Sequence, residues 1–206
     1  MITYLIIGIT SLVSVLAFSN RELLGKLLFN AHAVYANHEW YRLFSHGLVH
    51  ADFTHLLFNM LVLYSFGSNL ENYYFTQYFG AHAGLVFGLL YVTALPAANL
   101  YSYYKHKQDF SYNALGASGA VSAILFSSIL ISPLSSLYLM FIPVPIPSFI
   151  FGFCYLAYSW YMGKKGRDNV GHDAHFWGAV YGIVFTLVLK KELFMHFIHQ
   201  VLSFSL

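Results

Sequence analysis

A serine flanked by two nearby glycines lies at the start of an apolar stretch in the middle of this chain. Ser118 lies in the segment Gly116-Ala117-Ser118-Gly119-Ala120, and no Asp, Glu, Lys or Arg occurs between Phe110 and Gly163. A later apolar stretch carries His175 near its beginning. A histidine within hydrogen-bond reach of a serine hydroxyl can take its proton and make the oxygen a nucleophile. The two residues therefore suggest a nucleophile and its base inside a lipid bilayer.

The composition is that of an integral membrane protein. Of the 206 residues, 58% are hydrophobic and 9% are charged, whereas soluble domains carry about 25% charged residues. The net charge of +2 gives no indication of a nucleic-acid partner, and the single cysteine, Cys154, excludes an intrachain disulfide. No linker, repeat or low-complexity tract interrupts the chain, so we expect one membrane domain over residues 1–206.

Six segments have, or nearly have, the roughly 17 to 20 apolar residues that a helix needs to cross a bilayer. They predict an all-α polytopic membrane protein with six transmembrane helices: Ile2–Phe18, Phe53–Leu70, Gly80–Tyr101, Ala114–Ile131, Ile146–Met162 and Ala174–Leu189. Three prolines, Pro143, Pro145 and Pro147, predict a turn between the fourth and fifth spans. The tail Lys190–Leu206 is either an interfacial amphipathic helix or a continuation of the last span.

The polar residues of the spans lie near the beginnings of the second, fourth and sixth. Because successive spans alternate in direction, these three beginnings reach the same membrane face. His55 and Asn59 are four residues apart and share a helix face, and both can donate hydrogen bonds to an oxyanion. Backbone N–H groups at the start of the Ser118 helix lack intrahelical partners and favour an anion beside the serine.

Small residues predict how the fourth and sixth spans pack. His175, Gly178 and Gly182 form one helical stripe, and Gly178-x-x-x-Gly182 lets a neighbouring helix approach closely. The fourth span offers a matching stripe of Gly119 and Ala123 beside Ser118. Such an approach would bring the His175 imidazole to the Ser118 hydroxyl, while Gly116 and Gly119 allow a tight turn and close approach of a substrate backbone.

Three blocks in this order resemble the rhomboid family of intramembrane serine proteases, over about Glu39 to Gly182. The blocks are Glu39-Trp40-Tyr41-Arg42-Leu43-Phe44 followed by His50, His55, Asn59, Gly67 and Glu71; Gly116-Ala117-Ser118-Gly119-Ala120; and Ala174-His175-Phe176-Trp177-Gly178 ending at Gly182. In combination these blocks are highly specific.

The resemblance implies a six-span, rhomboid-like bundle of the bacterial type, in the bacterial inner (cell) membrane. It implies that Ser118 is the nucleophile and His175 the general base, and that His55, Asn59 and the Ser118 backbone N–H form the oxyanion hole. His50, Trp40, Arg42 and Glu71 match positions that the family uses mainly for structure. The expected activity is hydrolysis of transmembrane segments of other membrane proteins through an acyl-enzyme, with no cofactor and no metal.

Two features depart from the family pattern. The loops on the face of Ser118 hold most of the lysines and arginines, so the positive-inside rule would place that face in the cytoplasm, opposite to bacterial relatives. We follow the family for orientation. Ser122, one turn after Ser118, stands where some relatives carry a tyrosine.

Alternative functions remain open at this point. One is a catalytically silent rhomboid-like protein that binds membrane helices, although an intact serine and histidine argue against it. Another is a histidine-rich metal- or haem-binding membrane protein, although the histidines cluster near one face and alternate with Asn and Ser. The segment Met162–Asp173, with three glycines, is expected to be a mobile cap over the site, and His172 is expected in this loop.

Overall fold

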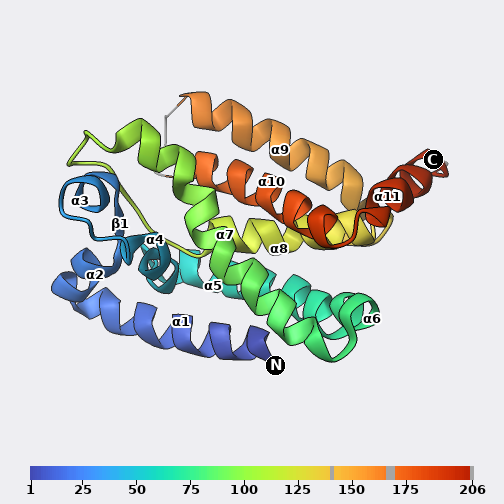
Figure 1. Cartoon of the computed structure of the whole chain (residues 1–206), viewed down its shortest axis with the longest axis horizontal. Coiled ribbons are helices and arrows are strands. Elements are labelled where there is room, and N and C mark those ends of the chain that lie inside the picture. The colour runs from blue at the N-terminus through green and yellow to red at the C-terminus, as the bar shows by residue number, and fades with distance from the viewer. Residues whose placement is uncertain (140–141, 166–169, 205–206) are drawn as a thin grey trace.

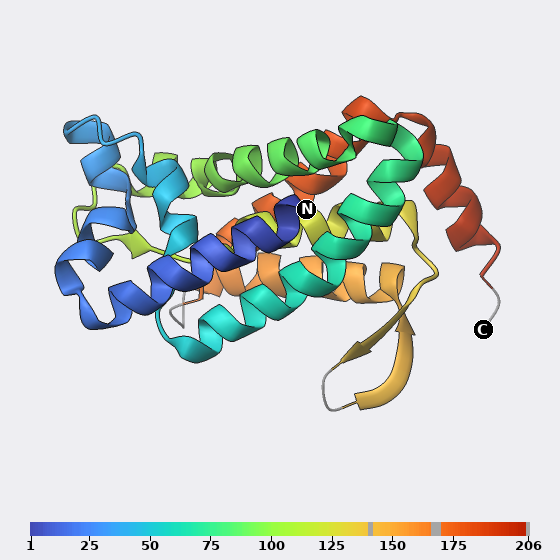
Figure 2. The same cartoon turned by 90° about the horizontal axis from the view of Figure 1, so that it is seen from below.

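The computed structural model describes residues 1–139, 142–165 and 170–204, and it is a bundle of helices with two short antiparallel strand pairs (Figures 1 and 2). The elements in chain order are α1 (Ile2–Ser19), α2 (Arg21–Leu27), β1 (Phe29–Asn30), α3 (Ala31–Ala36), α4 (Arg42–Ser45), η1 (His46–Leu48), α5 (Phe53–Val62), η2 (Leu63–Gly67), η3 (Leu70–Tyr74), α6 (Phe75–Phe79), η4 (Gly80–His82), α7 (Ala83–His106), β2 (Asn113–Ala114), α8 (Ser118–Ile131), β3 (Ser136–Leu139), β4 (Ile142–Pro147), α9 (Ser148–Lys165), α10 (His172–Leu189) and α11 (Glu192–Leu202).

Helix α8 is the centre of the bundle. Every residue from Gly119 to Ile131 is buried, as is expected of a helix that is apolar on all sides. Helix α10 packs along α8 and is held there by polar contacts as well. The Ser127 hydroxyl donates to the Gly182 carbonyl at 3.1 Å, and the Thr186 hydroxyl donates to Ser127 Oγ at 2.9 Å.

The beginnings of α5, α8 and α10 lie at one end of the bundle (Figures 1 and 2). The same end carries α2, α3 and α4, on the left in both views. This is the arrangement that the alternation of spans predicts. The opposite end holds α6, α11 and the β3–β4 pair.

Several predicted helix boundaries are wrong. The fourth segment does not become helical at Ala114, because Asn113 and Ala114 pair as strand β2 with β1 and the helix begins at Ser118. Pro143, Pro145 and Pro147 lie in strand β4, paired with β3, so Ile146 belongs to that strand and α9 begins at Ser148. Two other segments extend beyond their predicted ends. The second continues through two π-helical turns to Phe79, and the third, whose α-helix begins at Ala83 after the 3-10 turn Gly80–His82, continues to His106.

The last predicted span and the tail are separate helices. Helix α10 begins at His172, earlier than the predicted Ala174, and it ends at Leu189. At Lys190 the backbone leaves the helical region, with φ −143° and ψ 75°, and α11 then starts at Glu192. The tail is therefore not a continuation of the last span.

Within the described residues, two helical stretches are long and apolar enough to cross a membrane. They are Ile2–Ser19 and Phe53–His106. The second stretch has 54 residues, far more than the roughly 20 needed for one crossing. It reverses direction near Gly80, which has a positive φ of 54°, and the two halves then run in opposite directions (Figure 2).

The segment between α1 and α5 is folded and anchored to the bundle. The guanidinium of Arg42 donates to the carbonyl oxygens of Gly25 and Leu28, each at 2.8 Å, and is paired with Glu39. The Asn30 side chain donates to the carbonyl oxygens of Phe110 and Tyr112. Arg42 thus binds loop carbonyls, and the segment is attached to the connection that leads into α8.

A buried carboxylate joins the start of α1 to the second helical stretch. Glu71, in π-helical turn η3, accepts hydrogen bonds from the backbone N–H of Ile2 at 2.7 Å and of Thr3 at 2.9 Å, and from the Thr3 hydroxyl at 2.7 Å. A carboxylate is favourable at a helix N-terminus, because the orphan N–H groups and the helix dipole both stabilise it there.

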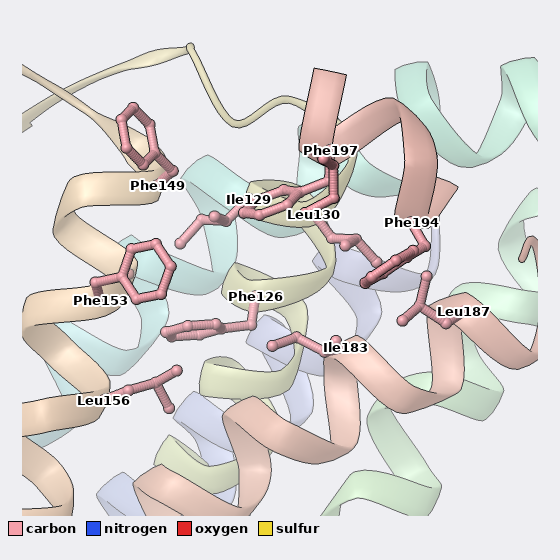
Figure 3. Close-up of a pocket in the computed structure, with 12 residues that line it drawn as sticks. Phe126, Ile129, Leu130, Phe149, Phe153, Leu156, Ile183, Leu187, Phe194 and Phe197 are labelled. Atoms are coloured by element: carbon pink, nitrogen blue, oxygen red, sulfur yellow. The ribbon is translucent and has the colours of Figure 1, made fainter. Parts of the chain in front are cut away.

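An apolar cavity of about 210 Å³ lies between helices α8, α9, α10 and α11. Phe126 of α8, Phe153 and Leu156 of α9, and Ile183 of α10 point into it (Figure 3). The cavity lies two or more helical turns beyond Ser118 along α8. It is therefore separate from the end of the bundle where the predicted site residues gather.

Candidate active site

Ser118 is the first residue of α8 and follows a turn that requires glycine. Gly116 has a φ of 108°, in the region that L side chains rarely adopt. A Cβ atom at Gly116 would lie 2.7 Å from Cε1 and 2.9 Å from Nε2 of His55. The His55 imidazole therefore lies directly against the backbone two residues before Ser118. The half-buried Ser118 side chain and the half-buried His55 ring share one end of the bundle.

His46 also holds this turn, a role that its position in the sequence did not predict. Its carbonyl accepts from the Gly116 N–H at 3.0 Å, and its Nδ1 donates to the Gly116 carbonyl at 3.3 Å. The Asn99 amide donates to His46 Nε2 at 3.2 Å. Burial lowers the pKa of His46 to about 4, so the ring is neutral at pH 7. The spacing of His46 four residues before His50 was the available signal for it.

His50 is fully buried and binds the backbone N–H of Ala117, the next residue of the turn. The Ala117 N–H donates to its Nε2 at 3.3 Å, so the ring proton lies on Nδ1. Nδ1 is 2.9 Å from the Ser14 hydroxyl, which donates to the Leu48 carbonyl at 2.9 Å. Burial, and then the neighbouring His55 ring, lower the pKa of His50 to about 3. The neutral ring thus orients the backbone next to Ser118.

His55 and Asn59 lie one turn apart in α5, as their spacing predicts. The His55 ring is 4.9 Å from the His50 ring, edge to face. The Asn59 amide donates to the His55 carbonyl at 3.0 Å, and this residue is buried. An amide nitrogen carries two hydrogens, so this bond uses one of the two.

Glycines bring α8 and α10 into backbone contact. A Cβ at Gly178 would lie 2.1 Å from the Gly119 carbonyl oxygen, and one at Gly182 would lie 2.1 Å from the Ala123 carbonyl oxygen. A Cβ at Gly119 would meet the Ala98 side chain at 2.7 Å and the Ala174 carbonyl oxygen at 3.3 Å. The residue after Ser118 therefore lies against the residue before His175, which is the close approach that the small-residue stripes predict.

The His175 ring is half-buried and lies at the level of the first turn of α8. Its centroid is 6.2 Å from the ring of Tyr155 in α9, with 30° between the two planes. The Tyr155 hydroxyl is 2.7 Å from Ser122 Oγ, one turn after Ser118. Neither Tyr155 nor its contact with His175 is found by sequence reasoning, because nothing in the local sequence of α9 marks the residue.

His172 does not lie in a loop as predicted. It is the first residue of α10, is buried, and has its ring 6.0 Å from that of His175 and 5.5 Å from that of Tyr158. The centre of the predicted cap, residues 166–169, lies outside the described residues. The two ends of that segment are helical or cap a helix, since α9 runs to Lys165 and Gly171 is the N-cap of α10.

Trp40, Arg42 and Glu71, which match positions that the rhomboid family uses mainly for structure, contact other parts of the fold. Trp40 is half exposed and packs at 6.1 Å on the Tyr103 ring, while Arg42 and Glu71 make the anchoring contacts described above. Within residues 1–139, 142–165 and 170–204, no group of three or more His, Cys, Asp or Glu side chains is placed to hold a metal ion. Of the polar side chains near Ser118, those of His46, His50 and Asn59 are hydrogen-bonded to backbone groups.

Fold and site together define a mainly helical protein in which a serine at a helix start shares one end of the bundle with histidines of two other helices. The family model described as Rhomboid domain matches residues 37–192. The chain is also 30% identical over 152 residues to "RHOMBOID-like protein 12, mitochondrial" of Arabidopsis thaliana, covering 70% of this chain and 45% of that protein. The chain belongs to the rhomboid family, and its apolar helices accord with a membrane protein. It spans less than half the length of the plant relative.

Proposed function

We propose that this chain is a six-span intramembrane serine endopeptidase that cleaves transmembrane segments of other membrane proteins. Helices α1, α5 to α6, α7, α8, α9 and α10 would be the spans of a single membrane domain. The observation that carries the proposal is the meeting of three elements at Ser118. The His55 ring lies on the Gly116 backbone, and Gly119 of the Ser118 helix lies on the backbone beside His175.

In the first half of the reaction, His175 takes the proton of the Ser118 hydroxyl while Ser118 Oγ attacks the scissile carbonyl carbon. The carbonyl oxygen becomes an oxyanion, which we assign to the His55 ring, the Asn59 amide and the Ser118 backbone N–H. Collapse of this intermediate breaks the C–N bond. The proton held by His175 passes to the departing amine, and the other half of the substrate stays on Ser118 as an ester.

In the second half, water attacks the ester carbonyl and gives its proton to His175. The C–O bond to Ser118 then breaks, the carboxylic product leaves, and the proton returns to Ser118 Oγ. Water must reach the end of the bundle that holds Ser118, where the site residues lie near the starts of α5, α8 and α10. Cleavage would therefore occur near one membrane face, which we take to be the outer face on the family pattern.

The expected substrates are membrane proteins whose spanning segment unwinds easily near that face. A stable helix hides its carbonyl groups in hydrogen bonds inside the bilayer. A peptide bond can reach Ser118 only after local unwinding. Helix-breaking or small residues near the cleaved bond should therefore favour hydrolysis.

The test uses purified chain in detergent and a fluorophosphonate probe that labels activated serines. Wild type, Ser118→Ala and His175→Ala are compared, with folding of each checked by thermal melting. Labelling of the wild type alone supports the proposal. Absence of labelling in a folded wild-type sample would favour a catalytically silent protein that binds membrane helices.

A further inference from the structure

Tyr155 of α9 connects the two elements that carry Ser118 and His175. Its ring stacks on His175 of α10, with 6.2 Å between centroids and 30° between planes. Its hydroxyl is bonded at 2.7 Å to Ser122 of α8. Ser122 is buried and lies one turn beyond Ser118. One side chain thus contacts His175 of α10 and the residue one turn beyond Ser118 in α8.

We propose that Tyr155, fixed by its hydrogen bond to Ser122, is the positioning residue that sets the orientation of the His175 ring toward Ser118. The inference rests on the proposed serine-protease function. Tyr155 is not assigned contact with the substrate or with the reacting atoms, because it acts through His175.

The Tyr155 ring is held in place from several sides. Phe126 of α8 lies 5.6 Å away at 48°, and Phe151 of α9 lies 5.9 Å away at 36°. The hydroxyl bond to Ser122 then determines the position of the far end of the ring. A helical serine commonly bonds the carbonyl one turn back, whereas Ser122 is paired with a side chain of another helix.

The fixed position of the Tyr155 ring matters for His175, because a general base must keep its position relative to the serine while it accepts and then donates a proton. Small displacements of a reacting group lower rates strongly. The tyrosine ring stacked beside the imidazole restricts tilting of the histidine ring.

A simple packing role predicts a different pattern of substitution effects. The part of α8 beyond Ser122 and the first half of α9 line the apolar cavity (Figure 3), so this region is not uniformly close-packed. If Tyr155 only filled space, phenylalanine would replace it without effect. If it positions His175 through Ser122, loss of the hydroxyl alone must lower the rate.

The experiment measures labelling by the fluorophosphonate probe as a function of probe concentration, which separates the limiting rate from the probe affinity. Tyr155→Phe and Ser122→Ala should each lower the limiting rate about fivefold to tenfold, as is typical for the loss of one hydrogen bond, with probe affinity unchanged. The double variant should be no slower than either single variant, because both remove the same bond. Tyr155→Leu, which also removes the stack, should be slower still.

Tyr161→Phe is the matched control, since it removes a hydroxyl from an exposed ring of the same helix, and it should label at the wild-type rate. Wild-type limiting rates for Tyr155→Phe and Ser122→Ala would overturn the inference. So would a double variant whose loss equals the product of the two single losses. If the wild type is labelled through Ser118 and the Tyr155 variants match it, only this inference fails; an unlabelled wild type counts against the proposed function as well.

Discussion

Gly178 is the position where one added methyl group should separate Ser118 from His175. A Cβ there would lie 2.1 Å from the Gly119 carbonyl oxygen, 2.8 Å from its carbonyl carbon and 3.0 Å from its Cα. These are backbone atoms of a buried helix and cannot rotate away. Gly178→Ala must therefore move α10 as a body relative to α8.

The size of the movement follows from the contact. Real Cβ atoms essentially never approach a heavy atom closer than 3.0 Å, so the two helices must separate by about 1 Å at this level. Overpacking of this kind costs about 1–3 kcal/mol of stability. Because a displacement of about 1 Å at a reacting centre can cost about 100-fold in rate, we expect a loss of fluorophosphonate labelling of that order.

Thermal melting in detergent and the labelling rate are measured together on the same samples. Gly8→Ala is the matched control, since it adds a methyl group to a glycine of α1 with no heavy atom within 4 Å of the new Cβ. Its melting temperature should stay unchanged or rise, because alanine favours a helix over glycine by about 1 kcal/mol. A Gly178→Ala protein that melts and labels like wild type would show that the close contact of α8 and α10 is not required for the site.

Three other changes test the contacts that hold the site. Glu71→Gln should lower the stability by about 1–3 kcal/mol in melting experiments, because an amide cannot accept all the bonds from the start of α1; an unchanged melting temperature would contradict this role. Arg42→Lys should also lower the melting temperature, since an ammonium cannot reproduce the fork that reaches two carbonyls and Glu39; full stability in the lysine variant would mean that the fork is dispensable. Finally, the lowered pKa values of His46 and His50 make stability depend on pH. The unfolded chain binds more protons than the folded chain below about pH 6.5, so stability is complete above that pH and falls progressively toward about pH 4, by about 3 kcal/mol for His46 alone. Melting curves at pH 7.5, 6 and 5 measure the effect, and a melting temperature that does not change with pH would refute it.

Much of the bundle could be read from the sequence, because the signals are local. Apolar runs of sufficient length predict helices, and alternation of direction predicts which ends meet. The glycine stripe of α10 predicts close approach of a neighbouring helix, and the structure has that approach at Gly178 and Gly182. The types of the residues around Ser118 are also enough to suggest the chemistry.

Other boundaries depend on contacts between distant parts of the chain. The fourth helix starts at Ser118 and not at Ala114 because residues 113 and 114 pair with residues 29 and 30, and because His46 and His50 bind the backbone of Gly116 and Ala117. The pattern of apolar residues along a segment does not indicate which distant residues pair with it. The same holds for the prolines of β4, which appear as a turn until the pairing with β3 is known.

The sequence by itself determines that the chain is apolar and helical, and which serine and histidine stand at helix starts. Only the tertiary structure decides that Ser14, His46 and Asn99 support the turn before Ser118, and that Tyr155 faces His175. The physical reason is that helix periodicity specifies which residues share a face, but the partner of each face is set by packing among helices far apart in the chain.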